Sequence, residues 1–477
     1  MLDDMLNYAE QLRERPVWQP IPAHIKDSFH TALPQHGEEL AVLHQRFMQD
    51  ILPYSIGNAH PGFMGWVQGG GTPVGMVADM LAAGLNANVG GREQIPIAVE
   101  RQILDWMREL FKFPTSANGL FVTGTSMANF IAVVIARTNF LSGEVRKSGL
   151  RLQHRRLIAY TSAGAHGCVA KAMDLAGFGT DALRLVPMNP QFQIDLDSLT
   201  RQISVDRAQG YQPFLIVGTA GSVDVGAVDD LSALADLARS EQCWFHIDGA
   251  YGALGMMSPQ IAPRLTGIER ADSIAFDFHK WGQVPYDAGY ILVRDGANQL
   301  AAFSSPANYL KRETRGMAAG SPWPCDLGPD LSRGFRALKT WFTIATFGTQ
   351  KLGEIMHNTC ELARYLAVRI GDEARLELLS PVNLNIVCFR YTGFSNLQQL
   401  SVDEANTLNN ELVIRLQEFG LVAPSSTMIG QHFAIRAAFV NHRTTRTDVD
   451  QLIASTLRVG DELLSTGWLR CSQLIAG

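Results

Sequence analysis

Lys280 and Asp248 are the residues whose types and positions point most directly to chemistry. Asp248 closes one strand-like run, and Lys280 comes shortly after another such run at 273–276. A lysine amine can hold an aldehyde as a Schiff base. A carboxylate facing a pyridine nitrogen keeps that nitrogen protonated, so that the ring can accept an electron pair. Together the two residue types predict pyridoxal phosphate chemistry, although either one alone is common at a strand end.

A second group of residues is suited to the phosphate of such a cofactor. Gly124, Thr125 and Ser126 follow the strand-like run 120–123 and precede an apolar, helical stretch at 130–137. Hydroxyls and backbone N–H groups at a helix N-terminus form an anion site. A Gly-Thr-Ser sequence before a helix is by itself only an N-cap, so this interpretation depends on the neighbouring segments.

Three further residues stand where other strand-like runs end. His166 follows the run 157–160, and its imidazole could stack on a cofactor ring. Thr219 follows the run 214–217 and offers a hydroxyl, while Ala250 is small enough for a flat ring to lie against it. A lone histidine in such a place is usually structural. The evidence that His166 contacts a cofactor therefore comes from the segments around it.

These positions require a particular arrangement of strands and helices. Seven short β-rich runs alternate with helical stretches between residues 70 and 310. Such alternation predicts an α/β fold with a mostly parallel seven-stranded sheet, helices on both faces and a site at the carboxyl ends of the strands. The runs are 120–123, 157–160, 183–186, 214–217, 244–247, 273–276 and 289–293.

The character of the sequence changes on either side of this region. Residues 1–69 mix helical stretches with prolines, and we expect an N-terminal helical arm that packs against a dimer partner. We expect residues 70–345 to form the large domain that binds the cofactor. Residues 346–477 contain long helical stretches and two strand candidates, 384–389 and 433–439, which predict a small C-terminal α+β domain.

Composition and charge favour small-molecule chemistry. The 477 residues carry 40 Lys and Arg against 46 Asp and Glu, without the blocks of like charge that indicate binding to nucleic acid or to an anionic membrane. The six cysteines show no zinc-binding spacing, so we expect reduced thiols and no metal site. The acidic N-terminus and the absence of a membrane-spanning apolar run predict a cytoplasmic protein.

The same segments resemble a known family, the group II pyridoxal phosphate-dependent amino acid decarboxylases. That family includes aromatic L-amino acid, glutamate, cysteine sulfinate and diaminobutyrate decarboxylases. The resemblance runs from about His60 to Gly348, and its strongest element is Asp277-Phe278-His279-Lys280-Trp281. The other matching segments, which are highly specific in combination, are 60–63, 124–129, 165–167, 246–251 and 334–342.

This resemblance implies the aspartate aminotransferase-type fold and pyridoxal 5'-phosphate as the cofactor. By position it implies that Lys280 forms the Schiff base, that Asp248 partners the pyridinium nitrogen and that His166 stacks on the ring. It also implies that Thr219 helps to hold His166. The residues expected around the cofactor are completed by Gly124, Thr125, Ser126, Ala250 and His279.

Family members are dimers with composite active sites, so we expect a homodimer. The apolar side chains of the arm that a partner would bury are Leu40, Val42, Leu43 and Phe47. The resemblance also predicts a substrate pocket that includes His60, Phe63, Trp66 and Arg92. Of these, Arg92 or Phe63 would reach the site of the neighbouring subunit.

Two departures from the family pattern bear on the phosphate and the substrate. Animal aromatic decarboxylases carry an asparagine that reaches the phosphate, whereas this chain has Asp277, whose charge would repel a dianion. The sequence Asp-Phe-His-Lys also resembles the diaminobutyrate branch. The segment 88–93 stands where the animal enzymes carry bulky side chains that grip the aromatic ring. The sequence therefore constrains the substrate side chain only loosely.

The implied reaction releases CO2 from an amino acid and returns a proton to its Cα. In the family this proton comes from a tyrosine on a mobile loop after the lysine, and Tyr309 stands at the corresponding distance. The residues that follow, 313–320, are rich in glycine and alanine, as expected of a loop that closes over a site and excludes water.

We therefore predict an L-amino acid decarboxylase with a preference for an aromatic substrate. Two other enzymes fit the same residues: a decarboxylase for a polar or acidic amino acid such as diaminobutyrate, glutamate or aspartate, and an aldehyde synthase that also deaminates its product oxidatively. A binding or regulatory protein on this fold is disfavoured. It would not need the proton donor Tyr309 in addition to Lys280 and His166.

Overall fold

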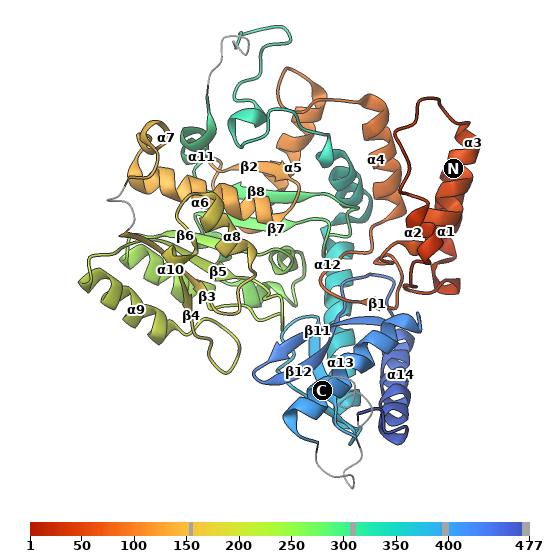
Figure 1. Cartoon of the computed structure of the whole chain (residues 1–477). Helices are drawn as coiled ribbons and strands as arrows, with labels where there is room; N and C mark the ends of the chain where they lie inside the picture. The colour runs from red at the N-terminus through yellow and green to blue at the C-terminus, as the bar shows by residue number, and fades with distance from the viewer. Residues whose placement is uncertain (152–155, 306–311, 394–399, 470–477) are drawn as a thin grey trace. The chain divides into compact units, whose positions relative to one another are not determined.

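The computed structural model describes residues 1–151, 156–305, 312–393 and 400–469 (Figure 1). The chain divides into two compact units, a larger one of residues 71–358 and a smaller one that combines residues 1–70 with residues 359–477. The long helix α12 (Arg336–Gly371) contributes to both units and has non-helical backbone at Gly348. The predicted N-terminal arm is therefore grouped with the C-terminal part of the chain.

A seven-stranded sheet organises the larger unit, in the order β2-β8-β7-β6-β5-β3-β4. β8 runs antiparallel to its neighbours β2 and β7, whereas all the other neighbouring pairs are parallel. The predicted mostly parallel sheet is thus confirmed, with each strand at a predicted run. The strands are β2 (Asn118–Val122), β3 (Leu157–Ser162), β4 (Leu183–Val186), β5 (Gln212–Thr219), β6 (Trp244–Asp248), β7 (Ser273–Asp277) and β8 (Gly289–Val293).

Burial on both faces explains why the central strands are nearly continuous apolar runs. Every residue of β3, β6, β7 and β8 is buried, as in sheets covered by helices on both sides. Helix α6 (Thr125–Leu141) packs against β2, β5, β6, β7 and β8, and its Ile131, Ala132 and Ile135 are fully buried. This helix therefore forms the centre of the core on its side of the sheet.

The other helices of the larger unit surround this core (Figure 1). α9 and α10 both pack against β5, while α8 and α11 pack against α6. Their bounds are α4 (Pro73–Leu85), α5 (Ile95–Phe111), α7 (Val145–Ser148), α8 (Cys168–Leu175), α9 (Leu196–Ala208), α10 (Leu231–Ser240) and α11 (Gly296–Phe303).

The smaller unit contains a five-stranded sheet of order β1-β11-β12-β10-β9. The strands predicted at 384–389 and 433–439 correspond to β10 (Ile386–Tyr391) and β12 (His432–Ala438). The sequence did not predict β9 (Leu376–Leu378), which is very short, or β11 (Ala423–Ile429). β11 was missed because its centre, Ser-Ser-Thr, lacks apolar residues. Helices α13 (Val402–Glu418) and α14 (Arg446–Ser465) pack on these strands and complete an α+β layout.

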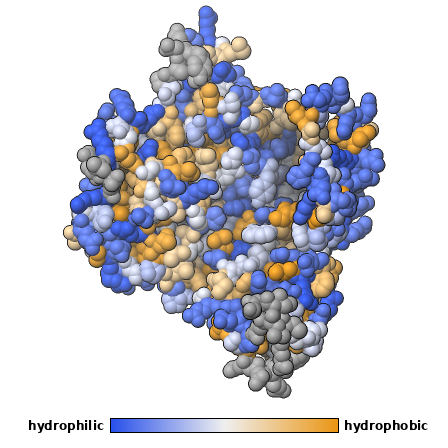
Figure 2. Space-filling view, in the orientation of Figure 1, coloured by the Kyte–Doolittle hydropathy of each residue, from blue (hydrophilic) through white to orange (hydrophobic). Residues whose placement is uncertain are grey.

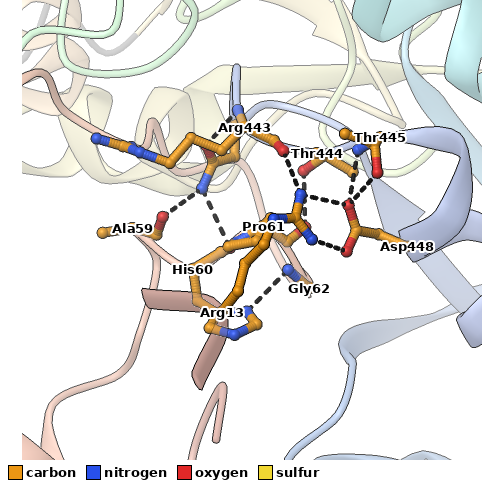
Figure 3. Close-up of polar contacts among 10 residues, drawn as sticks. Arg13, Ala59, His60, Pro61, Gly62, Arg443, Thr444, Thr445 and Asp448 are labelled. Carbon is orange, nitrogen blue, oxygen red and sulfur yellow. Dashed lines mark hydrogen bonds and ion pairs between the residues drawn. The ribbon is translucent and has the colours of Figure 1, made fainter. Parts of the chain in front are cut away.

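The N-terminal residues pack against the C-terminal residues within the smaller unit. Strand β1 (Phe63–Met64) pairs in parallel with β11, and Phe63 is buried with Val17 and Ala423. Arg13 donates to both carboxylate oxygens of Asp448, at 2.8 and 3.1 Å (Figure 3). The helices of this segment are α1 (Leu2–Glu10), α2 (Ala23–Asp27) and α3 (Leu40–Arg46). Part of the packing surface that the arm requires is thus supplied by its own chain.

Candidate active site

The carboxyl ends of five strands bring the predicted cofactor residues to one edge of the large sheet. Thr125 follows β2, His166 follows β3, Thr219 ends β5, Asp248 ends β6 and Lys280 follows β7. Thr219 and Asp248 are direct partners in the register of their two strands. The site lies where an open, mostly parallel sheet is expected to bind ligands.

Lys280 is paired with a carboxylate from its own segment. Its Nζ lies 3.0 Å from Oδ2 of Asp277, and 22% of the lysine side chain is exposed. The other carboxylate oxygen of Asp277 accepts a hydrogen bond from the backbone N–H of Thr125 at 2.8 Å. Asp277 is buried, and its two contacts connect Lys280 to the helix N-terminus that was predicted to bind phosphate.

His279 supports this carboxylate from a second side. Its Nδ1 accepts a hydrogen bond from the backbone N–H of Ala288 at 3.0 Å, and its ring packs on Tyr286 with 4.2 Å between ring centroids. Burial lowers the pKa of His279, so the ring is neutral at pH 7 and carries its proton on Nε2. That nitrogen lies 3.6 Å from Oδ2 of Asp277.

The start of α6 offers polar groups that the protein itself leaves unused. The hydroxyl of Thr125 is buried and has no hydrogen-bond partner within the described part of the chain. Ser126 is exposed next to it. A side chain at Gly289 of β8 would come within 2.4 Å of Cα of Gly124, so glycine there allows the strand and the turn to approach closely.

Thr219 presents a second unused hydroxyl. Its Oγ1 is buried without a partner among the residues that the structure covers, and no hydrogen bond joins it to His166. The backbone N–H of Thr219 donates to Asp229 Oδ2 at 2.8 Å, and Asp229 Oδ1 accepts from the N–H of Ile194 at 2.7 Å. Burial raises the pKa of Asp229 to about 6. This aspartate, which sequence reasoning missed, anchors the end of β5.

His166 and Ala250 lie beside the strand ends in the expected positions. Nδ1 of His166 accepts a hydrogen bond from the backbone N–H of Cys168 at 3.2 Å, and the residue is exposed. The N–H of Ala250 donates to Oδ1 of Asp248 at 3.1 Å. Oδ2 of the same carboxylate accepts from the side-chain amide of Asn129 at 3.0 Å. Asn129 is a further residue whose role was not predicted.

Three predicted pocket residues belong to the smaller unit. Nδ1 of His60 accepts a hydrogen bond from the N–H of Gly62 at 2.9 Å (Figure 3), and burial lowers the pKa of His60. Phe63 is buried with Val17 and Ala423. Trp66 is 52% exposed and has left-handed backbone, with φ of 47°. Their roles in substrate binding stay predictions.

Arg92, the fourth predicted pocket residue, belongs to the larger unit. It is exposed, and its guanidinium carbon lies 4.7 Å from the ring centroid of Trp323. Arg312 lies 3.5 Å from the same centroid and donates to both carboxylate oxygens of Asp326 at 2.9 Å. Tyr309, the predicted proton donor, lies outside the described residues.

The predicted loop 313–320 is held by hydrogen bonds of its own. The N–H of Glu313 donates to the carbonyl of Ala318 at 3.0 Å, and the indole N–H of Trp323 donates to that of Ala319 at 2.7 Å. Gly316 has a φ of 80°, which favours glycine in the turn between them. The loop is therefore anchored at Trp323.

A lysine, a carboxylate and buried hydroxyls at this edge of a mostly parallel seven-stranded sheet define a pyridoxal phosphate enzyme of the aspartate aminotransferase-type fold. Residues 22–392 match the model of the pyridoxal-dependent decarboxylase conserved domain. The chain belongs to this family. It is thus a carboxy-lyase that acts on an amino acid and uses pyridoxal 5'-phosphate as its cofactor.

Individual relatives match over nearly the whole chain. The chain is 30% identical over 469 residues to aromatic-L-amino-acid decarboxylase of Bacillus atrophaeus, covering 97% of this chain and 94% of that protein. It is 25% identical to phenylacetaldehyde synthase of Arabidopsis thaliana, covering 92% of this chain and 90% of that protein. The crystal structure of Oryza sativa TDC with PLP and tryptamine has the same fold as this chain, with a TM-score of 0.88 at 24% identity. The match covers 97% of this chain and 96% of that chain.

The residues present fit this cofactor. The unpartnered hydroxyls of Thr125 and Thr219 are buried polar groups that a ligand can satisfy, and burying such groups without a partner is costly. Thr125 and Ser126 stand at a helix N-terminus suited to phosphate, and Lys280 is accessible for attachment. When bound, the cofactor supplies a ring that accepts the electron pair released as CO2 leaves.

Proposed function

We propose that the chain decarboxylates an aromatic L-amino acid to the amine and CO2, with Lys280 and Asp248 at the two ends of the cofactor. The observation that carries this proposal is the position of Lys280 and Asp248 at the ends of the adjacent strands β7 and β6, beside the unpartnered hydroxyls of Thr125 and Thr219. The aromatic preference is supported by the name of the Bacillus atrophaeus relative.

Each residue has a distinct role in this proposal. Lys280 holds the cofactor aldehyde until the substrate amine replaces it, and Asp248 faces the ring nitrogen. His166 covers one face of the ring, and Ala250 leaves room for the other. The hydroxyls of Thr125 and Ser126 and the N–H groups of Gly124 and Ser126 bind the phosphate, because the N–H of Thr125 already donates to Asp277. The roles of His60, Phe63, Trp66 and Arg92 in binding the substrate stay predictions.

Borohydride reduction tests the assignment of Lys280. Reduction of the holoenzyme should attach the cofactor covalently to the peptide that contains Lys280, as located by peptide mass spectrometry. Lys280→Ala should lose both the label and the activity. Lys171→Ala, at an exposed lysine of α8, is the matched control and should keep both. A label on another lysine would contradict the assignment.

A CO2-release screen of the common L-amino acids tests the substrate class. The highest kcat/KM should be found for an aromatic amino acid. The highest value for diaminobutyrate, glutamate or aspartate would instead favour the polar alternative that the segment Asp277-Phe278-His279-Lys280 suggests.

The aldehyde synthase is a second candidate because a phenylacetaldehyde synthase is among the relatives. Product analysis separates it from a decarboxylase that releases the amine.

A homodimer belongs to the same proposal. Three of the apolar side chains predicted to face a partner are exposed in the single chain: Leu40 by 66%, Val42 by 54% and Leu43 by 45%. Phe47 is partly exposed. Hydrophobic residues lie among hydrophilic ones on the face drawn in Figure 2. Contiguous exposed apolar side chains on one short helix are typical of an interface.

The cytoplasmic location also stays a proposal. The five cysteines within the described residues, Cys168, Cys243, Cys325, Cys360 and Cys388, form no disulfide bonds with one another, as expected in a reducing compartment. None of the helices that the structure describes is long and apolar enough to cross a membrane.

A further inference from the structure

A row of buried polar side chains leads from the middle of the large sheet to Asp248. Nε1 of Trp244 lies 2.8 Å from Oγ of Ser273, which lies 2.8 Å from Nδ1 of His246. Nε2 of His246 lies 2.8 Å from Oδ1 of Asn129, whose Nδ2 lies 3.0 Å from Oδ2 of Asp248. All five residues are buried, so water does not compete for these hydrogen bonds.

The fold explains why these residues meet. Trp244, His246 and Asp248 alternate along β6, and alternate residues of a strand point to the same face of the sheet. Ser273 is the register partner of His246 on the neighbouring strand β7. Asn129 comes from α6, the helix that packs on these strands. The row is therefore placed by three elements at the centre of the core.

The direction of the hydrogen bonds follows from the two ends of the row. An indole nitrogen only donates, and an ionised carboxylate only accepts. Ser273 therefore accepts from Trp244 and donates to Nδ1 of His246. The proton of His246 is then on Nε2 and is donated to the carbonyl oxygen of Asn129. This leaves the amide N–H of Asn129 to donate to Asp248. Burial lowers the pKa of His246 to about 3, which keeps the imidazole neutral in this arrangement.

A thiol supports the same carboxylate oxygen. Sγ of Cys168 lies 3.7 Å from Oδ2 of Asp248 and 3.1 Å from Nδ2 of Asn129. Burial raises the pKa of Cys168 to about 12, so the thiol keeps its proton and can donate it. Because Ala250 donates to Oδ1, both oxygens of the carboxylate are held by donors.

We propose that Asn129, His246 and Ser273 are positioning residues that hold the Asp248 carboxylate in place for the ring nitrogen of the cofactor. Asn129 acts directly on the carboxylate, and His246 and Ser273 act by fixing the orientation of the Asn129 amide. The inference rests on the proposed role of Asp248. It predicts that removing these residues weakens cofactor binding only when Asp248 is present.

A double-mutant cycle on cofactor affinity tests this dependence. Equilibrium dialysis of the apoprotein gives the Kd for pyridoxal 5'-phosphate in the presence of Asp248 and in the Asp248→Ala background. Asn129→Ala should raise Kd by about tenfold or more in the first case, the usual effect of losing a hydrogen bond to a charged group. In the Asp248→Ala background the change should be less than about twofold. Equal increases in both backgrounds would overturn the inference.

Ser273→Ala tests a more distant part of the row, because Ser273 touches neither the carboxylate of Asp248 nor the amide of Asn129. It should raise Kd by roughly threefold, again only with Asp248 present. Thr161→Val is the matched control, because it removes a buried hydroxyl of β3 that donates to the carbonyl of Val217 at 3.1 Å. If the control raises Kd as much as Ser273→Ala does, general loosening of the sheet explains the effect and the inference is wrong.

Further variants separate a failure of the proposed role of Asp248 from a failure of the proposed positioning residues. If Asp248→Ala does not fold, as judged by thermal unfolding, Asp248→Leu, which fills the space but has no acceptor for the Asn129 amide, supplies the second background. Cys168→Ser retains a donor and should bind the cofactor normally, whereas Cys168→Ala should not. An Asp248→Ala protein with normal Kd and normal turnover would refute the proposed role of Asp248. A defective Asp248→Ala protein with equal losses in both backgrounds would refute only the row of positioning residues.

Discussion

The ammonium group of Lys280 lies 3.0 Å from the carboxylate of Asp277, which also accepts a hydrogen bond from the first N–H of helix α6, that of Thr125. One carboxylate thus contacts both the lysine proposed to attach the cofactor and the helix end proposed to bind its phosphate. Asp277 supports the free lysine, but its charge opposes a dianion at the same place. The charge of Asp277 should therefore lower the affinity for the phosphate group of the cofactor.

Asp277→Asn should strengthen the binding of pyridoxal 5'-phosphate relative to pyridoxal, which lacks the phosphate. Two unit charges about 5 Å apart repel by roughly 3 kcal/mol at an effective dielectric constant of about 20. Because the lost contact to Lys280 offsets part of this gain, we expect the Kd for the phosphate form to fall by about three- to tenfold. Equilibrium dialysis with both compounds measures the difference. Equal changes for the two compounds would show that Asp277 does not act on the phosphate.

Tyr309→Phe should change the product, because it removes only the hydroxyl proposed to protonate Cα. A positioned general acid typically contributes about 10²-fold or more, so amine formation should fall by that factor. CO2 release should continue, and aldehyde and ammonia should appear when oxygen is present. Product analysis of the wild type and the variant, with and without oxygen, measures this. Amine formation at the wild-type rate would assign the proton to another group, and aldehyde as the main wild-type product would favour the synthase.

His246 should make the protein sensitive to acid. Burial lowers its pKa to about 3 from the ordinary value of 6.5, so between these values the unfolded chain binds a proton that the folded chain does not. The free energy of unfolding therefore falls as the pH drops from 6.5 toward 3. At about 1.36 kcal/mol per pKa unit, the contribution is on the order of 5 kcal/mol.

Replacement of the imidazole tests this contribution. His246→Gln removes the titrating group, so the free energy of unfolding of its apoprotein should depend less steeply on pH between 6.5 and 3. Denaturant titrations at several pH values measure the slope. His36→Gln, at an exposed histidine, is the control and should keep the wild-type slope. An unchanged slope in His246→Gln would mean that other groups cause the acid sensitivity.

Charged residues on α3 should dissociate the proposed homodimer. Leu40→Asp combined with Leu43→Asp places two carboxylates where the interface is expected to exclude water, and burying unpaired charges is costly. Light scattering should show a shift from dimer to monomer, with activity lost in parallel. Leu175→Asp, at a residue 61% exposed on α8, should leave the mass unchanged. A double variant that stays dimeric would place the interface elsewhere.

The sequence predicted all seven strands of the large sheet because they are short apolar runs, buried within the core and separated by helices or turns. It missed β11, whose central Ser-Ser-Thr carries no apolar pattern, and it did not find that residues 1–70 join the C-terminal residues in one unit. That grouping depends on long-range contacts such as Arg13 with Asp448, which leave no periodic signal in the sequence.

For the active site, too, some features follow from the sequence and others from the tertiary structure. By itself the sequence determined the residues with reactive groups, because Lys280, Asp248 and Thr125 follow recognisable strand-like runs and their chemistry depends on residue type. Only the tertiary structure decided what surrounds them. The amide of Asn129 reaches Asp248 because α6 crosses β6, and Asp277 meets Thr125 because β7 and β2 end at the same edge of the sheet. Hydrogen bonds between residues distant in sequence depend on distances of a few ångströms that only the packing of the elements sets.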